Sequence, residues 1–255
     1  MPPRLPSLLN PRVWTHFLAA AAAQLLALLL FSRLQLIPHH LDFNPGIVLT
    51  PLAGILFGPA GVWSAMAAAL AGNWLLGTLS GLSIFQGAGL AVFAWTAWRL
   101  WDTVSESGAS WGRAAFFVLI CVPGALAAAA WHALGSEMLR LYPYAYIVSV
   151  AAAHHLVFCA LLGPPLILFT ARFECPRAPP TNPSRALVIA GSAMAAAFLG
   201  VGVSRRVYGI GPFEPFVLGL HAGPWVPAVV IPLLLLHLAA LAGVSWPLGR
   251  GRSRA

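Results

Sequence analysis

The sequence predicts an all-α membrane protein, a polytopic helical bundle of about eight transmembrane helices. Of its 255 residues, 60% are hydrophobic and only 8% are charged, whereas soluble domains carry about 25% charged residues. The mean hydropathy is +0.84. Several apolar runs approach or exceed the ~20 residues that a helix needs to cross a bilayer. These runs occupy most of the 26.9 kDa mass, so we expect no separate soluble domain.

Eight apolar segments follow one another along the chain. The first comes shortly after two arginines, as in a signal peptide, but it continues to about Phe31 and no small-residue cleavage site follows it. We therefore interpret it as an uncleaved span. The eight predicted segments are approximately 13–33, 45–58, 59–77, 82–101, 114–133, 145–171, 186–204 and 222–246.

The stretch from Asn44 to Trp101 organises the rest of the chain. It contains no Lys, Asp or Glu, and its only arginine, Arg99, lies at its far end. Prolines and glycines interrupt it repeatedly, which indicates three closely spaced membrane segments joined by tight turns. Its first segment, 45–58, is short for a span. The sequence leaves open whether this segment crosses the membrane or forms a re-entrant hairpin with the next one.

Arginine placement favours eight full spans. Short cytoplasmic loops of membrane proteins carry an excess of basic residues, and all 14 basic residues here are arginine. With a cytoplasmic N-terminus, ten arginines fall inside and four fall outside. We therefore expect a multi-pass protein of the bacterial plasma (inner) membrane with both termini in the cytoplasm. The four predicted outside are Arg33, Arg140, Arg205 and Arg206.

The segment 172–185 is the clearest linker, because it contains four prolines and no apolar period. It divides the chain into three predicted parts. Residues 1–175 would form a six-helix membrane core with a substrate pocket, 176–185 a proline-rich cytoplasmic linker, and 186–255 a C-terminal two-helix hairpin with a basic tail. The three cysteines include no CxxC pair, so neither a disulfide framework nor a zinc site is predicted.

Polar side chains within apolar spans usually face a cavity or each other. In the predicted topology they gather near the outer ends of the core helices. We expect two amides to hydrogen-bond a small solute, an indole to stack on it, and two imidazoles to add polar contacts. Interhelical hydrogen bonding is the alternative for the amides, and an ordinary interfacial aromatic belt is the alternative for the indole. The predicted binding residues are Asn44, Asn73, Trp74, Gln86, His132 and His155.

Other function classes lack support in the sequence. His154 and His155 point about 100° apart on a helix, which disfavours a shared metal, and we predict neither a metal site nor a cofactor. The sequence contains no GxSxG or HExxH motif, and its six acidic residues all fall in predicted loops or at span ends. We therefore do not expect an enzyme. Because the arginines are scattered over many short loops, we also predict no nucleic-acid partner.

One stretch resembles a known family. From Pro51 to Gly77, an apolar helix ends in Gly58-Pro59-Ala60-Gly61 and is followed by a helix with polar residues near its outer end. This pattern is similar to the middle of the substrate-binding S components of energy-coupling factor (ECF) transporters. The resemblance implies uptake of a vitamin-like molecule or another small solute, energised by a transmembrane coupling protein with ATPase subunits. The additional hairpin after Arg185 departs from the common six-span form.

The same stretch also looks like membrane sensor domains of the MASE type. These are eight-span modules with a Pro-x-Gly near the start of a helix, and Pro45-Gly46 is a partial match. Such modules normally carry a cytoplasmic signalling domain. This resemblance implies a non-transporting sensor or assembly module that acts with a separate partner. The sequence leaves open the identity of the solute, the oligomeric state, and whether any histidine binds a metal.

Overall fold

The chain folds into a helical bundle. The computed structural model describes residues 11–32, 34–37, 41–101, 110–170, 181–208 and 225–243. A 3₁₀ turn, η1 (Pro45–Val48), leads into α2, and two very short strands, β1 (Gln35–Ile37) and β2 (Leu41–Asp42), pair antiparallel. Apart from this small hairpin, the all-α prediction is confirmed. The helices are α1 (Pro11–Phe31), α2 (Leu49–Phe57), α3 (Pro59–Leu75), α4 (Gly81–Trp101), α5 (Ser110–Met138), α6 (Tyr144–Thr170), α7 (Pro183–Tyr208) and α8 (Trp225–Ala242).

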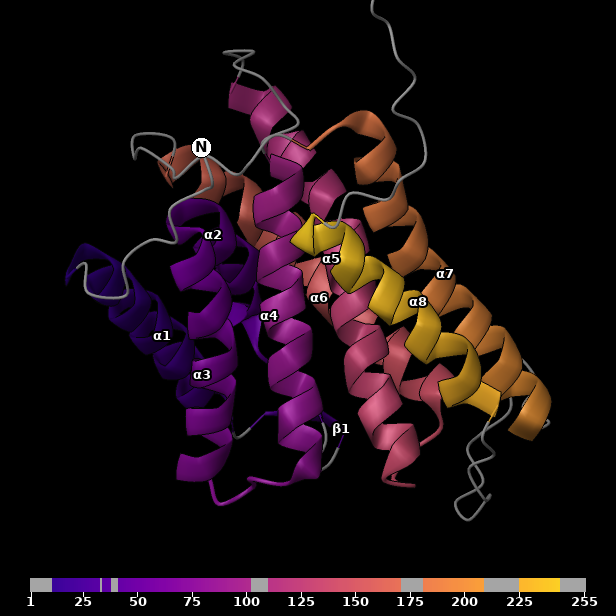
Figure 1. Cartoon of the computed structure of the whole chain (residues 1–255). Coiled ribbons are helices and arrows are strands. Elements are labelled where there is room, and N and C mark those ends of the chain that lie inside the picture. Colours follow the sequence, from indigo (N-terminus) through magenta and orange to yellow (C-terminus); the bar gives the residue numbers. More distant parts are fainter. Residues whose placement is uncertain are drawn as a thin grey trace, which may run out of the picture.

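Successive helices run in alternating directions through the bundle (Figure 1). His16 near the start of α1 lies against Phe57 at the end of α2, with ring centroids 5.1 Å apart. Arg185 in the first turn of α7 donates hydrogen bonds to carbonyls at the end of α8, those of Ala240 and Leu241. The starts of α1, α3, α5 and α7 therefore share one end of the bundle with the ends of α2, α4, α6 and α8. We call this the terminal end.

The other end carries the α3–α4 connection (76–80) and the α5–α6 connection (139–143). The β1–β2 hairpin lies near the same end (Figure 1), and we call it the hairpin end. Helices that begin with proline follow the usual preference for proline at the first helical position. Prolines also lie inside α5, α6 and α8, which membrane helices tolerate because neighbouring groups satisfy the freed backbone.

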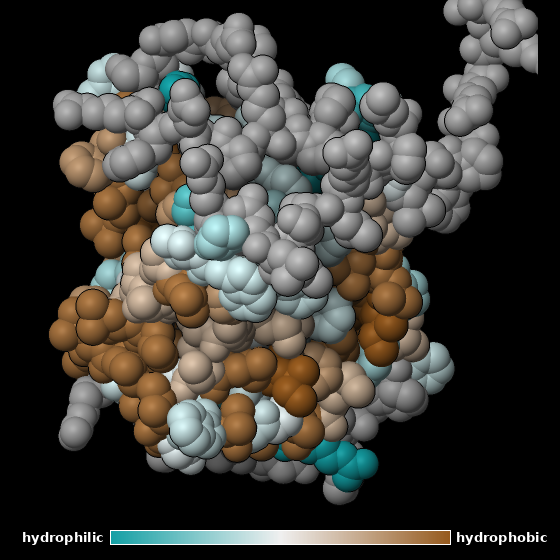
Figure 2. Space-filling model, turned by 60° about the vertical axis from the view of Figure 1, so that its left-hand side comes forward, coloured by the Kyte–Doolittle hydropathy of each residue, from teal (hydrophilic) through white to brown (hydrophobic). Residues whose placement is uncertain are grey.

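Five helices, α1, α5, α6, α7 and α8, are long and apolar enough to cross a membrane. The segment Pro45–Phe57 is a shorter apolar helix, and α3 has 17 residues. Hydrophobic residues cover much of the side of the bundle, while the most hydrophilic visible residues lie near its upper and lower ends (Figure 2). A surface of this kind suits a hydrocarbon environment, so the chain is a membrane protein.

The segment predicted at 45–58 begins inside the bundle. The backbone N–H of Asn44, just before η1, donates to Nε2 of His154 over 3.1 Å. Four residues of η1 and nine of α2 rise only about 20 Å, short of the ~30 Å of hydrocarbon. At the terminal end Gly58 has a φ of +56°, where glycine avoids the strain of a side chain, and the chain turns into α3. This segment therefore crosses only part of the bundle.

Close helix packing around α2 depends on small residues. A Cβ on Gly54 would lie 2.1 Å from the carbonyl oxygen of Ala94 on α4, and one on Gly61 would lie 1.9 Å from that of Ala53. Helices in lipid gain little from hydrophobic burial against each other, so close backbone approach supplies much of their attraction. The GxxxG pattern of Gly54 and Gly58 thus serves contacts within this chain.

The C-terminal helices belong to the same core as the helices before them. Ile189 and Ala193 of α7 and Leu241 of α8 lie in one buried cluster with residues of α4 and α5. A second cluster joins α5, α6, α7 and α8. Of the predicted linker, 176–180 lie outside the described residues and 183–185 form the first turn of α7.

Candidate functional site

A line of polar side chains leads from the hairpin end into the bundle. The hydroxyl of Thr78, exposed in the α3–α4 connection, donates to the backbone carbonyl of Asn73 over 3.3 Å. Nδ2 of Asn73 donates to Oε1 of Gln86 over 3.1 Å, and Nε2 of Gln86 lies 3.1 Å from Nε2 of His132. Burial increases along this line, because Thr78 is exposed, the two amides are half-buried and His132 is buried.

The line continues into two adjacent imidazoles of α6. His155 lies near His132 and His154, and the rings of His154 and His155 have centroids 5.6 Å apart. Both are buried, with 7% and 5% of their surface exposed. At a rise of 1.5 Å per residue they lie about 15 Å from the start of α6. We call Thr78, Asn73, Gln86, His132, His155 and His154 the polar track.

Asn44 meets the polar track through its backbone. Its N–H donates to His154, while its side-chain Oδ1 accepts from the backbone N–H of Gly46 over 2.9 Å. The side chain therefore caps η1, a common role of asparagine before a helical turn. Asn44 thus fixes the start of the α2 segment against α6.

Trp74 lies apart from the polar track. It follows Asn73 directly in the last turns of α3, and 68% of its surface is exposed. Successive residues on a helix point about 100° apart, so Asn73 faces α4 while Trp74 faces outward. The structure thus brings together Asn73, Gln86, His132, His155 and the backbone of Asn44. It leaves Trp74 in the position of an interfacial aromatic residue.

Two nitrogens of the polar track have no hydrogen-bond partner in the described part of the chain. They are Nδ1 of His154 and Nδ1 of His155, and both are buried. The ring of His155 also hydrogen-bonds the backbone carbonyl of Ala125. A buried polar group without a partner costs about 1–3 kcal/mol. These two atoms therefore leave hydrogen-bonding capacity for a bound molecule at the inner end of the polar track.

Other buried polar residues are hydrogen-bonded within the bundle. Nε2 of Gln24 donates to Ser64 over 3.1 Å, and Thr50 donates to Oε1 of Gln24 over 3.1 Å. This network joins α1, α2 and α3. Sequence reasoning missed Gln24, although an amide in the middle of an apolar run was a visible signal.

A second internal network holds the C-terminal helices. His237 of α8 is completely buried, and its Nε2 lies 3.0 Å from the hydroxyl of Thr96 on α4. Its Nδ1 donates to the carbonyl of Ile189 on α7 over 2.9 Å and lies 3.2 Å from Ser192. Both ring nitrogens are therefore engaged, and the role of this histidine is to tie three helices together.

Glu137 organises the hairpin end. It is 1% exposed, its Oε2 accepts from the backbone N–H of Tyr144 over 2.6 Å, and its Oε1 accepts from the hydroxyl of Tyr208. The first contact caps the start of α6, where a carboxylate is favoured by the exposed N–H groups. The second connects α5 to the end of α7. Glu137 therefore fixes the helix that carries His154 and His155.

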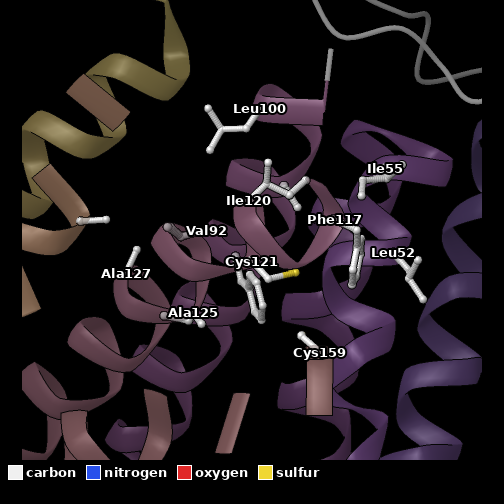
Figure 3. Close-up of a cluster of buried hydrophobic side chains, with 14 of the residues drawn as sticks. Leu52, Ile55, Val92, Leu100, Phe117, Ile120, Cys121, Ala125, Ala127 and Cys159 are labelled. Carbon is white, nitrogen blue, oxygen red and sulfur yellow. The ribbon is translucent and has the colours of Figure 1, made fainter. Parts of the chain in front are cut away.

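A cluster of buried apolar side chains, drawn in Figure 3, packs against the inner end of the polar track. Phe93 stacks on His155 with ring centroids 5.8 Å apart. One turn further along α6, Cys159 is fully buried with Cys121 and Phe117 of α5. The polar track therefore begins at the surface of the hairpin end and meets apolar packing at its inner end.

No group of three or more metal-ligating side chains occurs among the described residues. His39 and His40 lie outside those residues. Comparison of the chain with protein-family models, with curated proteins and with solved structures gives no match. The site is therefore interpreted from its own geometry.

Proposed function

We propose that this protein binds a small solute at the polar track and serves as the specificity subunit of a solute uptake system. The observation that carries the proposal is the pair of buried, unpartnered imidazole nitrogens at the end of a line of polar groups that begins at the surface. The other buried networks around Gln24 and His237 contain no such nitrogens. A blind polar path suits binding better than conduction, because its inner end meets apolar packing.

We further propose about eight membrane crossings, with the terminal end in the cytoplasm of a bacterial cell. Two observations support this orientation. The helices alternate in direction, and the segments that lead to and from the terminal end contain ten of the 14 arginines. Basic residues concentrate on the cytoplasmic side of membrane proteins. The solute would then enter from outside, at the hairpin end.

Uptake requires an energy source, and we propose a coupling protein with ATPase subunits as the partner. The support is the similarity of residues 51–77 to ECF S components. The alternative is a membrane sensor or assembly module of MASE-like architecture, which the eight alternating helices and their shared core favour. Both functions use the same solute site, and they differ in the partner.

Native mass spectrometry of the protein purified in mild detergent from its own membranes tests the proposal. We expect a bound small molecule that is lost in Asn73→Ala and Gln86→Ala. The matched control is Thr96→Val, which removes a buried hydroxyl outside the polar track and should retain the molecule. Co-eluting ATPase subunits support uptake, and a co-eluting signalling protein supports the sensor. If the wild-type protein carries no small molecule and the spectra of Asn73→Ala and Gln86→Ala are the same as its own, the proposed solute site is wrong.

A further inference from the structure

The hydrogen-bond partners of His154 and His155 determine which ring nitrogens carry protons. A neutral imidazole has one N–H donor and one lone-pair acceptor. Nε2 of His154 receives the backbone N–H of Asn44, and a backbone N–H can only donate. Nε2 must therefore be the acceptor, which places the proton on Nδ1. The unpartnered Nδ1 of His154 is thus a free donor.

The opposite arrangement holds in His155. Its ring hydrogen-bonds the carbonyl of Ala125, and a carbonyl can only accept. Because Nδ1 has no partner, the donor must be Nε2, which leaves a lone pair on Nδ1. Two neighbouring rings, 5.6 Å apart, therefore present one free donor and one free acceptor.

Among the described residues, the side chains that pack against the two rings are aromatic. Phe43 and Phe158 pack against His154, with centroids 6.4 and 5.1 Å away, and Phe93 stacks on His155. An ion buried without a counter-charge is strongly disfavoured, so this environment selects against a charged ligand.

We propose that the inner end of the polar track binds an uncharged planar solute that carries a hydrogen-bond acceptor beside a donor, such as an amide or a lactam edge. The acceptor of the solute receives a hydrogen bond from Nδ1–H of His154, and the donor of the solute donates to the lone pair on Nδ1 of His155. The flanking phenyl rings favour a flat molecule. This inference deepens the proposed function and rests on it.

Glutamine substitutions separate the two roles of each ring. The side-chain amide of glutamine reaches the position of Nε2 but offers nothing at Nδ1. His154→Gln keeps an acceptor for the N–H of Asn44, and His155→Gln keeps a donor for the carbonyl of Ala125. Each removes only the free nitrogen. His237→Gln is the matched control, because it makes the same change in a buried histidine outside the polar track.

The binding test uses uracil and nicotinamide as uncharged probes, with orotate and nicotinate as charged probes built on similar rings. We expect at least one uncharged probe to raise the thermal unfolding midpoint of the detergent-purified protein, and the charged probes to have no effect. Each track variant should weaken binding of that probe about tenfold, the value of one hydrogen bond. His237→Gln should lower the baseline midpoint and leave the affinity unchanged.

Nitrogen-15 NMR of the histidine rings provides a test without a ligand. We expect the Nδ1–H tautomer for His154 and the Nε2–H tautomer for His155, assigned by the loss of each signal in its glutamine variant. Different tautomers overturn the inference. It is also overturned if neither uncharged probe binds, if charged probes bind equally, or if His154→Gln and His155→Gln bind normally. A charged molecule co-purifying with the wild-type protein would overturn this inference while the proposed solute site stands.

Discussion

The backbone N–H of Asn44 and the imidazole of His154 are joined by a hydrogen bond of 3.1 Å, although they are 110 positions apart in the sequence. This contact fixes the start of the α2 segment at the depth of the polar track. It also determines the tautomer of His154, because only one ring nitrogen can accept from Asn44. One bond thus connects the path of the chain to the chemistry of the site.

His154→Phe should therefore destabilise the protein more than His154→Gln. Phenylalanine fills a similar volume but leaves the N–H of Asn44 without an acceptor, at a cost of about 1 kcal/mol or more. Glutamine retains an acceptor. Thermal unfolding of the two variants in the same detergent measures the difference. Equal midpoints would show that this bond contributes nothing to stability.

Glu137→Gln should destabilise the hairpin end by about 1–3 kcal/mol. An amide has only one acceptor oxygen, so it can accept from the N–H of Tyr144 but can reach Tyr208 only by donating to its hydroxyl, which reverses that hydrogen bond. Tyr208→Phe removes one of these two contacts. Because both variants affect the same bond, the double variant should cost less than the sum of the single changes. Additive unfolding energies would contradict the geometry.

Gly54→Ala should be strongly destabilising, by roughly 1–3 kcal/mol. The added Cβ would meet the carbonyl of Ala94 at 2.1 Å, and backbone cannot move aside as a flexible side chain can. Gly191→Ala is the matched control, because that glycine lies in α7 with no atom within 4 Å of the added Cβ. The control should be neutral or stabilising, since alanine favours helix. The thermal unfolding midpoints of the two variants measure the difference. Equal midpoints for Gly54→Ala and Gly191→Ala would exclude close packing at Gly54.

His237→Leu should weaken the attachment of α7 and α8 to the rest of the bundle. It removes the contacts to Thr96, Ile189 and Ser192 and leaves their polar atoms buried, for a cost of about 2 kcal/mol or more. In the wild-type protein, limited proteolysis between residues 208 and 225 should leave α8 bound. In His237→Leu the cleaved fragment should dissociate sooner. Equal retention would assign the attachment to apolar packing alone.

Cysteine labelling tests the orientation. In a variant with Cys121, Cys159 and Cys175 replaced by alanine, Thr78→Cys should react with a membrane-impermeant thiol reagent on intact cells. Trp111→Cys, exposed at the start of α5, should react only after the membrane is opened. The reverse pattern would invert the orientation, and labelling of both positions from one side would exclude alternating crossings.

Apolar runs and their proline and glycine boundaries were sufficient to predict the helices, because these features are local. It was harder to predict which side chains of a helix point toward its neighbours. Asn73 and Trp74 are neighbours in sequence, yet only Asn73 turns toward α4. The partners of His237 were beyond prediction, since Thr96 lies 141 positions away and pairs with it only through the packing of α4 against α8. The short path of 45–57 likewise depends on a distant histidine, His154.

The short α2 has a consequence for biogenesis. A segment of this length cannot partition into the bilayer by itself as the ribosome delivers it, because it covers only part of the hydrocarbon thickness. Six of its nine residues are buried in the finished protein, and Gly54 needs the backbone of α4, which is synthesised later. We therefore expect the translocon to release α2 and α3 together as a hairpin. The α2 segment would then reach its final place only after α4 and α6 have emerged.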